Sequence, residues 1–248
     1  NPDGATLLQH IAASMKIALG GYVVGVIIGV PLGIAMAWNR KFEMFAKPLF
    51  DIIRPIPALA WIPLMILWLG IGYWSKVGII FFAAFISATI NSYAGIKRTS
   101  QVHLWVASTF GATNMQMLFK VAIPTALPMI FTGLRLALGS SWVALVAAEL
   151  LAATRGLGYM IQVARMLGRP DVIIVGMITI GVVGYLLSTI LEWLQTKFVK
   201  GGKKKMEPKK CASPFIEKHL PAIMTVIAFS SLLIIWECVA RFTKASMF

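Results

Sequence analysis

Ionisable and hydroxyl side chains inside long apolar runs are the residues of this chain that could do chemistry. Glu149 lies in the run from residue 126 to 152, together with Ser140 and Ser141. A charge at membrane depth is costly, which makes such a residue a functional candidate, and hydroxyls at that depth offer polar contacts. We predict that Ser140, Ser141 and Glu149 line a path for a solute, with Glu149 paired to Arg155 and acting in gating.

Proline spacing indicates a second part of the same path. The segment from residue 48 to 72 is apolar, but Pro55, Pro57 and Pro63 interrupt it. Each proline removes a backbone donor. At membrane depth, the freed carbonyl groups must be buried in protein or face water, so the interrupted segment is expected to line a cavity. We predict Pro57, Trp61 and Pro63 as path residues; a kinked structural helix is the alternative.

The sequence contains no arrangement typical of catalysis or of a bound metal. His10, His103 and His219 are scattered, and the two cysteines, Cys211 and Cys238, lack metal-ligand spacing. The chain has no glycine- and lysine-containing phosphate loop of the kind that binds ATP. We therefore expect that the chain is not itself an enzyme and binds no cofactor, so transport would need another subunit or an ion gradient.

Composition places the chain in a membrane. Hydrophobic residues make up 58% and charged residues 13% of the sequence, whereas about a quarter of the residues of a soluble domain are charged. The mean hydropathy is +0.81. The net charge of +14 comes from basic residues in the hydrophilic gaps, without a nucleic-acid motif, so retention on a cytoplasmic membrane face explains it better than nucleic-acid binding.

Apolar runs of membrane-crossing length predict an all-α polytopic protein with about six transmembrane helices. In the first run, Gly21, Gly25, Gly29 and Gly33 recur every four positions, which lets another helix approach closely. A short surface helix is expected within residues 154–170. The six spans are expected at residues 7–38, 48–72, 77–94, 126–152, 172–194 and 220–240.

Residues 99–124, here named the elbow, are too polar to cross a bilayer and predict a short helix at its surface. Thr113 and Gln116 have the spacing of a capping box, so the helix should start there. Gly111 should end the preceding helical piece, and Pro124 should close the elbow. One apolar face is expected from residues at i, i+3, i+4 and i+7: Met115, Leu118, Phe119 and Ala122.

The elbow resembles a loop of the permeases of ATP-binding-cassette importers. Ala107, Gly111 and Ile123–Pro124 are similar to that loop, whose pattern starts with Glu-Ala-Ala, and Trp105 stands in place of its glutamate. The likeness extends over about residues 1 to 200 and is greatest to the nitrate, sulfonate and taurine branch. Three further stretches carry it: RPIPALAWIP (54–63), TGLR (132–135) and AAELLAATRGLG (147–158).

This resemblance implies a permease of the bacterial inner membrane that moves a small anionic solute, taurine or an aliphatic sulfonate being favoured. It implies a homodimer, two cytoplasmic ATPase subunits that hold ATP and Mg²⁺, and a periplasmic or lipid-anchored solute-binding protein. Nitrate, bicarbonate and vitamin-precursor permeases are similar, so the substrate stays open. Contacts with the ATPase would come from Ala107, Gly111, Ala112, Met115 and Leu118.

Charge distribution agrees with a cytoplasmic elbow, because the hydrophilic gaps on its side hold most of the lysines and arginines. From the residues alone, two other classes compete with the importer permease. A secondary transporter or channel acting without an ATPase fits the interrupted segment, although no clear inverted repeat accompanies it. A membrane-embedded enzyme is disfavoured by the missing catalytic arrangement.

Residues 206–248 follow the basic run from 203 to 205 and look like a fresh start at Met206. Their helix, 220–240, resembles the first membrane helix that these permeases carry ahead of the segment found here at 1–38. We therefore expect a core permease domain at 1–205. The additional helix of 206–248 would be the natural N-terminal segment, displaced by circular permutation or by the order in which fragments are numbered.

Overall fold

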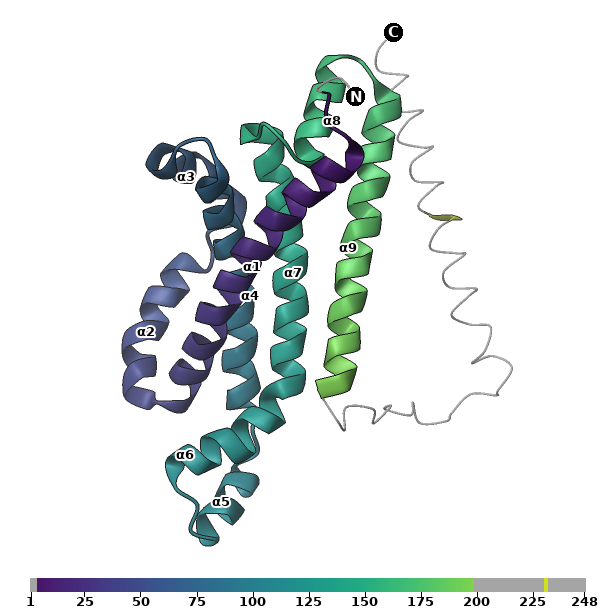
Figure 1. The fold of residues 1–248 in the computed structure, drawn as a ribbon. Coiled ribbons are helices and arrows are strands. Elements are labelled where there is room, and N and C mark those ends of the chain that lie inside the picture. The colour runs from purple at the N-terminus through teal and green to yellow at the C-terminus, as the bar shows by residue number, and fades with distance from the viewer. Residues whose placement is uncertain (1–3, 199–229, 232–248) are drawn as a thin grey trace, which may run out of the picture. The chain divides into compact units, whose positions relative to one another are not determined.

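The computed structural model describes residues 4–198 and 230–231 of the 248-residue chain. The chain divides into two compact units, Asn1–Gly202 and Lys203–Phe248, and the fold described here is that of the first. All regular elements within residues 4–198 are helical, as predicted (Figure 1). In chain order they are α1 (Leu7–Trp38), α2 (Arg40–Ile53), η1 (Ala58–Trp61), α3 (Ile62–Leu69), α4 (Tyr73–Lys97), α5 (Gln101–Thr109), α6 (Asn114–Met117), η2 (Leu118–Ala122), α7 (Ile123–Ala152), α8 (Leu157–Met166) and α9 (Pro170–Phe198).

Helices α1 and α4 pack together along the predicted glycine stripe. The four glycines of α1 at positions 21, 25, 29 and 33 are buried. A Cβ atom at Gly25 would lie 2.6 Å from the Cβ of Ala84 and 2.9 Å from the carbonyl oxygen of Phe81. The backbones of α1 and α4 are therefore so close that a side chain larger than that of glycine would clash at this position. This confirms the predicted close approach.

The predicted interruption of the second apolar segment is confirmed. Helix α2 and the η1–α3 pair meet at a bend of 80°. Pro57 precedes the first turn of η1 and Pro63 lies at the start of α3, where a missing N–H does least harm. The segment is thus two short helices rather than one kinked helix.

Four helices of the described part are long and apolar enough to cross a membrane, or five if the bent pair counts as one span. The sixth predicted span, residues 220–240, lies outside the described residues except for Ser230 and Ser231, which are helical. The prediction about the natural position of residues 206–248 lies outside them as well. The short surface helix expected within residues 154–170 is α8.

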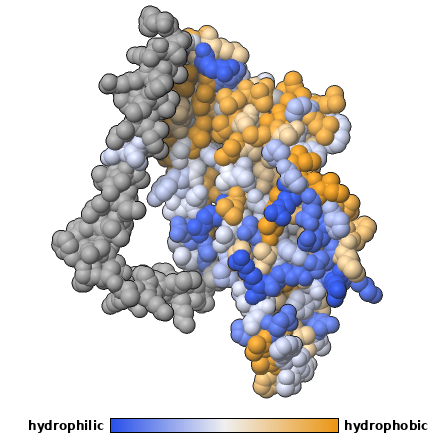
Figure 2. Space-filling model, turned by 180° about the vertical axis from the view of Figure 1, so that it is seen from behind, coloured by the Kyte–Doolittle hydropathy of each residue, from blue (hydrophilic) through white to orange (hydrophobic). Residues whose placement is uncertain are grey.

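Helix α9 lies at the side of the bundle and exposes much of its apolar surface. Only 6% of its most hydrophobic window is buried. Large apolar side chains that it exposes include Ile174, Met177, Ile178, Tyr185 and Trp193. Figure 2 shows, on the rear of the molecule, apolar surface over the upper part and hydrophilic residues gathered toward the end that carries the elbow. Cations near that end include Arg40, Lys41, Lys97, Arg98 and Lys197.

Candidate coupling elbow and buried carboxylate

The elbow protrudes beyond one end of the long helices as α5 and α6 (Figure 1). Helix α5 ends where predicted, because Gly111 has a φ of +76°, a left-handed conformation that glycine adopts without strain. The N–H of Gly111 donates to the carbonyl of Ser108 at 2.9 Å, and the N–H of Ala112 to that of Ala107 at 3.1 Å. These two bonds form a Schellman motif, which ends α5 firmly and turns the chain back.

The next helix starts at the predicted capping box. The N–H of Thr113 donates to Oε1 of Gln116 at 2.9 Å, and the N–H of Gln116 to Oγ1 of Thr113 at 3.4 Å. The prediction that Pro124 closes this helix is wrong, because α6 continues through η2 into α7. The wider turn of η2 and the position of Pro124 in the first turn of α7 accommodate the missing N–H.

The elbow exposes several large apolar side chains within the described part of the chain. Phe110 is 88% exposed and Trp105 is 66% exposed. Neither was among the predicted contact residues; an aromatic side chain directly before the helix-ending Gly111 is the signal that could have indicated Phe110. The further large apolar side chains exposed on the elbow are Val102, Val106, Met115 and Phe119.

The inner side of the elbow is fixed to the long helices. Leu118 and Ala122 are buried in a cluster with Ile96 of α4 and with Ala126 and Ile130 of α7. The elbow is therefore joined by close packing to two membrane helices, and a displacement of the elbow would displace their ends.

The five predicted contact residues do not share one surface. Gly111 and Met115 are exposed, and Ala107 and Ala112 are half-buried. Leu118 is only 8% exposed and faces the bundle. The single apolar face expected for the elbow is thus split, because the wider turn of η2 rotates Leu118 and Ala122 inward while Met115 stays outside.

At the opposite end of the long helices, Glu149 of α7 is 1% exposed and hydrogen-bonded on both carboxylate oxygens. Oε1 accepts a bond of 2.7 Å from the hydroxyl of Ser14, and Oε2 accepts one of 2.9 Å from the N–H of Gly158. The N–H of Leu157 in turn donates to the Ser14 hydroxyl at 2.9 Å. The predicted pairing with Arg155 is wrong: Arg155 is exposed, and the carboxylate instead holds the first turn of α8.

His10 belongs to the same buried cluster. Its Nδ1 accepts a bond of 3.2 Å from the N–H of Gly156, the residue before α8. Sequence reasoning missed both His10 and Ser14, because they lie in α1, more than a hundred residues from their partners. Glu149 is therefore positioned as a junction between helices α1, α7 and α8.

The other predicted path residues also make contacts within the chain. Ser141 is buried and donates to the carbonyl of Ile80 at 3.5 Å, while Ser140 lies 3.3 Å from the Ser87 hydroxyl. The ring of Trp61 stacks on Phe82 with centroids 4.3 Å apart. Pro57 and Pro63 are exposed. The structure brings η1 and α7 against α4, and a path along a dimer axis stays a prediction.

Comparisons with known proteins identify the family. Residues 25–203 match the family described as "binding-protein-dependent transport system inner membrane component". The chain is 42% identical to the taurine transport system permease protein of Escherichia coli (strain K12) over 78% of this chain and 70% of that protein. It is 35% identical to a bicarbonate transport system permease protein of Synechococcus elongatus over 78% of this chain and 69% of that protein.

A solved structure has the same fold. An inward-facing methionine ABC transporter chain superposes with a TM-score of 0.68 at 19% identity, covering 77% of this chain and 95% of that one. Within residues 4–198 and 230–231, no group of three or more potential ligands could hold a metal ion. The helices long enough to cross a membrane, the family match over residues 25–203 and the similar permeases all point to the same family. The chain belongs to the inner membrane components of binding-protein-dependent ABC transport systems.

Proposed function

We propose that this chain is the permease of an ATP-driven importer for a small anionic solute, taurine or an aliphatic sulfonate being favoured, which an extracytoplasmic binding protein delivers. Taurine carries a sulfonate and bicarbonate is itself an oxyanion, so the solutes named for two relatives share a small oxyanion group. The higher identity to the taurine permease favours the sulfonate.

The uncovered aromatic end of the elbow carries this proposal. Exposed aromatic residues are typical anchors of protein–protein interfaces. Trp105 lies in α5, which stands outside the long helices, and Phe110 directly precedes the turn formed at Gly111 (Figure 1). In the proposed assembly, two copies of the chain form a pore and each elbow binds one cytoplasmic ATPase. The buried contacts of Leu118 would pass the movement of the ATPase on to α4 and α7.

A recess beside the elbow supports the same contact. It has a volume of about 290 Å³ and lies where the ends of α1 and α4 meet the elbow. Trp38, Lys97, Thr99 and Asn114 are among the residues that line it. Protein–protein interfaces typically have an apolar core surrounded by a polar rim. The exposed aromatic residues of the elbow would form the core of the ATPase contact, and the polar recess would form part of its rim.

Purification of the chain from its native membrane tests the assembly. We expect an ATPase to copurify, and the reconstituted complex should import a radiolabelled sulfonate only with ATP and the binding protein present. Uptake driven by an ion gradient without any ATPase would instead favour a secondary transporter or channel. A thermal-shift screen of the binding protein with taurine, other sulfonates, nitrate and bicarbonate would identify the solute.

A further inference from the structure

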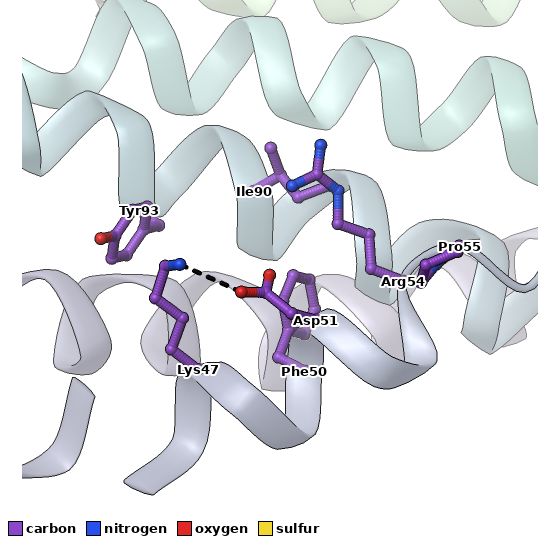
Figure 3. A pocket seen from close by; sticks show the side chains of 7 residues that line it. All are labelled: Lys47, Phe50, Asp51, Arg54, Pro55, Ile90 and Tyr93. Carbon is purple, nitrogen blue, oxygen red and sulfur yellow. Dashed lines mark hydrogen bonds and ion pairs between the residues drawn. The ribbon is translucent and has the colours of Figure 1, made fainter. Parts of the chain in front are cut away.

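A cavity of about 580 Å³, lined by both charged and apolar side chains, lies between α2 and α4, before the bend of the broken span. Figure 3 shows Lys47, Asp51 and Arg54 projecting from α2 into the space beside Ile90 and Tyr93 of α4. Helix α2 starts at the end of the bundle that carries the elbow. At 1.5 Å per residue its 14 residues rise about 21 Å, so a span that enters the membrane at Arg40 would place Arg54 inside a hydrocarbon core of about 30 Å.

The side of α2 next to α4 carries a stripe of charged residues beside the buried Phe50, whereas the opposite side is apolar. Glu43, Lys47, Asp51 and Arg54 follow one another at three- or four-residue spacing and form one stripe on the α4 side. The opposite face exposes Phe45, Leu49 and Ile52. Charged residues within a membrane face a water-filled or protein-lined space, so this stripe indicates a hydrated cavity.

All but one of the charges in the stripe are neutralised. Lys97 donates to Glu43 at 2.7 Å, and the Tyr93 hydroxyl donates to the same carboxylate. Lys47 pairs with Asp51 at 3.0 Å.

The remaining charge is that of Arg54. Its guanidinium has no hydrogen bond or ion pair among residues 4–198 and 230–231, and in Figure 3 it extends over Ile90 into the cavity. The cavity therefore contains one uncompensated positive charge.

We propose that Arg54 binds the oxyanion group of the transported solute in this cavity. A planar guanidinium presents paired donors that match sulfonate or carbonate oxygens. An anionic lipid headgroup has the same chemistry, but the apolar face that would hold acyl chains lies on the other side of α2, which favours a free solute. The class of solute rests on the function proposed above, whereas the position of the site rests on the cavity and on Arg54.

Labelling of an Ile90→Cys variant in which Cys211 and Cys238 are replaced by serine tests the site without depending on transport. The purified complex in phosphatidylcholine nanodiscs is treated with a water-soluble methanethiosulfonate reagent, with and without methanesulfonate. We expect methanesulfonate to slow labelling several-fold, and Arg54→Gln to abolish that protection. No labelling, or protection that persists in Arg54→Gln, would overturn the proposal. Protection by phosphatidylglycerol alone would assign the cavity to a lipid headgroup and overturn it equally.

Uptake separates this proposal from the proposed function. Hydrogen bonds to a charged group contribute about 1.5–3 kcal/mol, so Arg54→Gln should lower uptake by about tenfold or more. Arg54→Lys should recover part of the loss, and Arg40→Gln, an equal charge change at the exposed start of α2, should have no effect. Full uptake by Arg54→Gln would refute the contact between Arg54 and the solute but would leave the proposed function standing. Absence of sulfonate and bicarbonate uptake by the unaltered complex would refute the proposed function, while the labelling experiment still decides the site.

Discussion

The hydroxyl of Ser14 in α1 donates a hydrogen bond of 2.7 Å to Oε1 of Glu149 in α7, across 135 positions of sequence. The second oxygen of that carboxylate accepts the N–H of Gly158 at the start of α8. One buried side chain thereby ties three helices together. Because donors and acceptor are all removed from water, separating these helices would leave polar groups unpaired.

We predict that Glu149→Ala destabilises the chain without a change in the elbow. Each buried donor left unpaired costs about 1–3 kcal/mol, and this substitution leaves both the Ser14 hydroxyl and the Gly158 N–H without an acceptor. Glu149→Gln keeps one acceptor oxygen, so its loss should be smaller. Thermal unfolding in detergent measures the effect. Glu192→Ala, the same change at an exposed position of α9, is the control. Equal melting temperatures for Glu149→Ala and Glu192→Ala would show that Glu149 does not stabilise the packing of α1, α7 and α8.

We predict that Gly25→Val separates α1 from α4. Its Cβ would lie 2.6 Å from the Cβ of Ala84, and the added methyl groups have no space between two helix backbones. Overpacking of this kind costs about 1–3 kcal/mol and occasionally more, so the yield of folded protein should fall. Gly139→Ala serves as the control because nothing lies within 4 Å of its added Cβ. Size-exclusion profiles and melting curves of the two variants should differ clearly.

We predict that Phe110→Ala weakens ATPase binding while the isolated chain stays as stable as before. The ring is 88% exposed, so its removal costs the fold almost nothing, whereas loss of an interface anchor costs about 2 kcal/mol or more, roughly a thirtyfold change in Kd. Leu8→Ala, at a 75% exposed residue near the other end of α1, should leave the affinity unchanged. Titration of the ATPase against the permease in nanodiscs provides the measurement. An unaltered Kd for Phe110→Ala would exclude the aromatic end of the elbow from the contact.

We predict that Gly111→Asp inserts normally but uncouples ATP hydrolysis from uptake. Nothing in the chain lies within 4 Å of a Cβ at this position, so any clash would come from a partner. Gly111→Asn is the matched variant, because Asn and Asp both tolerate the left-handed conformation and differ in charge. Failure of both variants would indicate that the partner needs a small residue, and failure of Asp alone would indicate charge repulsion. Normal transport by both at normal expression would show that Gly111 is not part of the motor contact.

Sequence by itself determined the features that depend on neighbouring residues. The capping box at Thr113, the helix end at Gly111 and the interruption at Pro57 follow from local hydrogen bonds and backbone geometry, and all three are present. The glycines of α1 indicated close approach of another helix, since spacing alone brings them onto one face. Two local predictions were wrong: the ending at Pro124, because a proline in the first turn of a helix does not stop it, and the single apolar face of the elbow, which is split between exposed and buried residues.

Tertiary structure alone decided which side chains meet. The partner of Glu149 is Ser14 rather than the nearby Arg155, because the rotation and crossing of α1 and α7 determine which buried donors reach the carboxylate. Packing against α4 and α7 likewise buries Leu118, whereas Phe110 is exposed, although both side chains are apolar. Within the part of the chain that the structure describes, Arg54 has no ion pair, because Asp51 pairs with Lys47 and Glu43 pairs with Lys97. Such contacts depend on helices distant in the chain, and no local pattern specifies them.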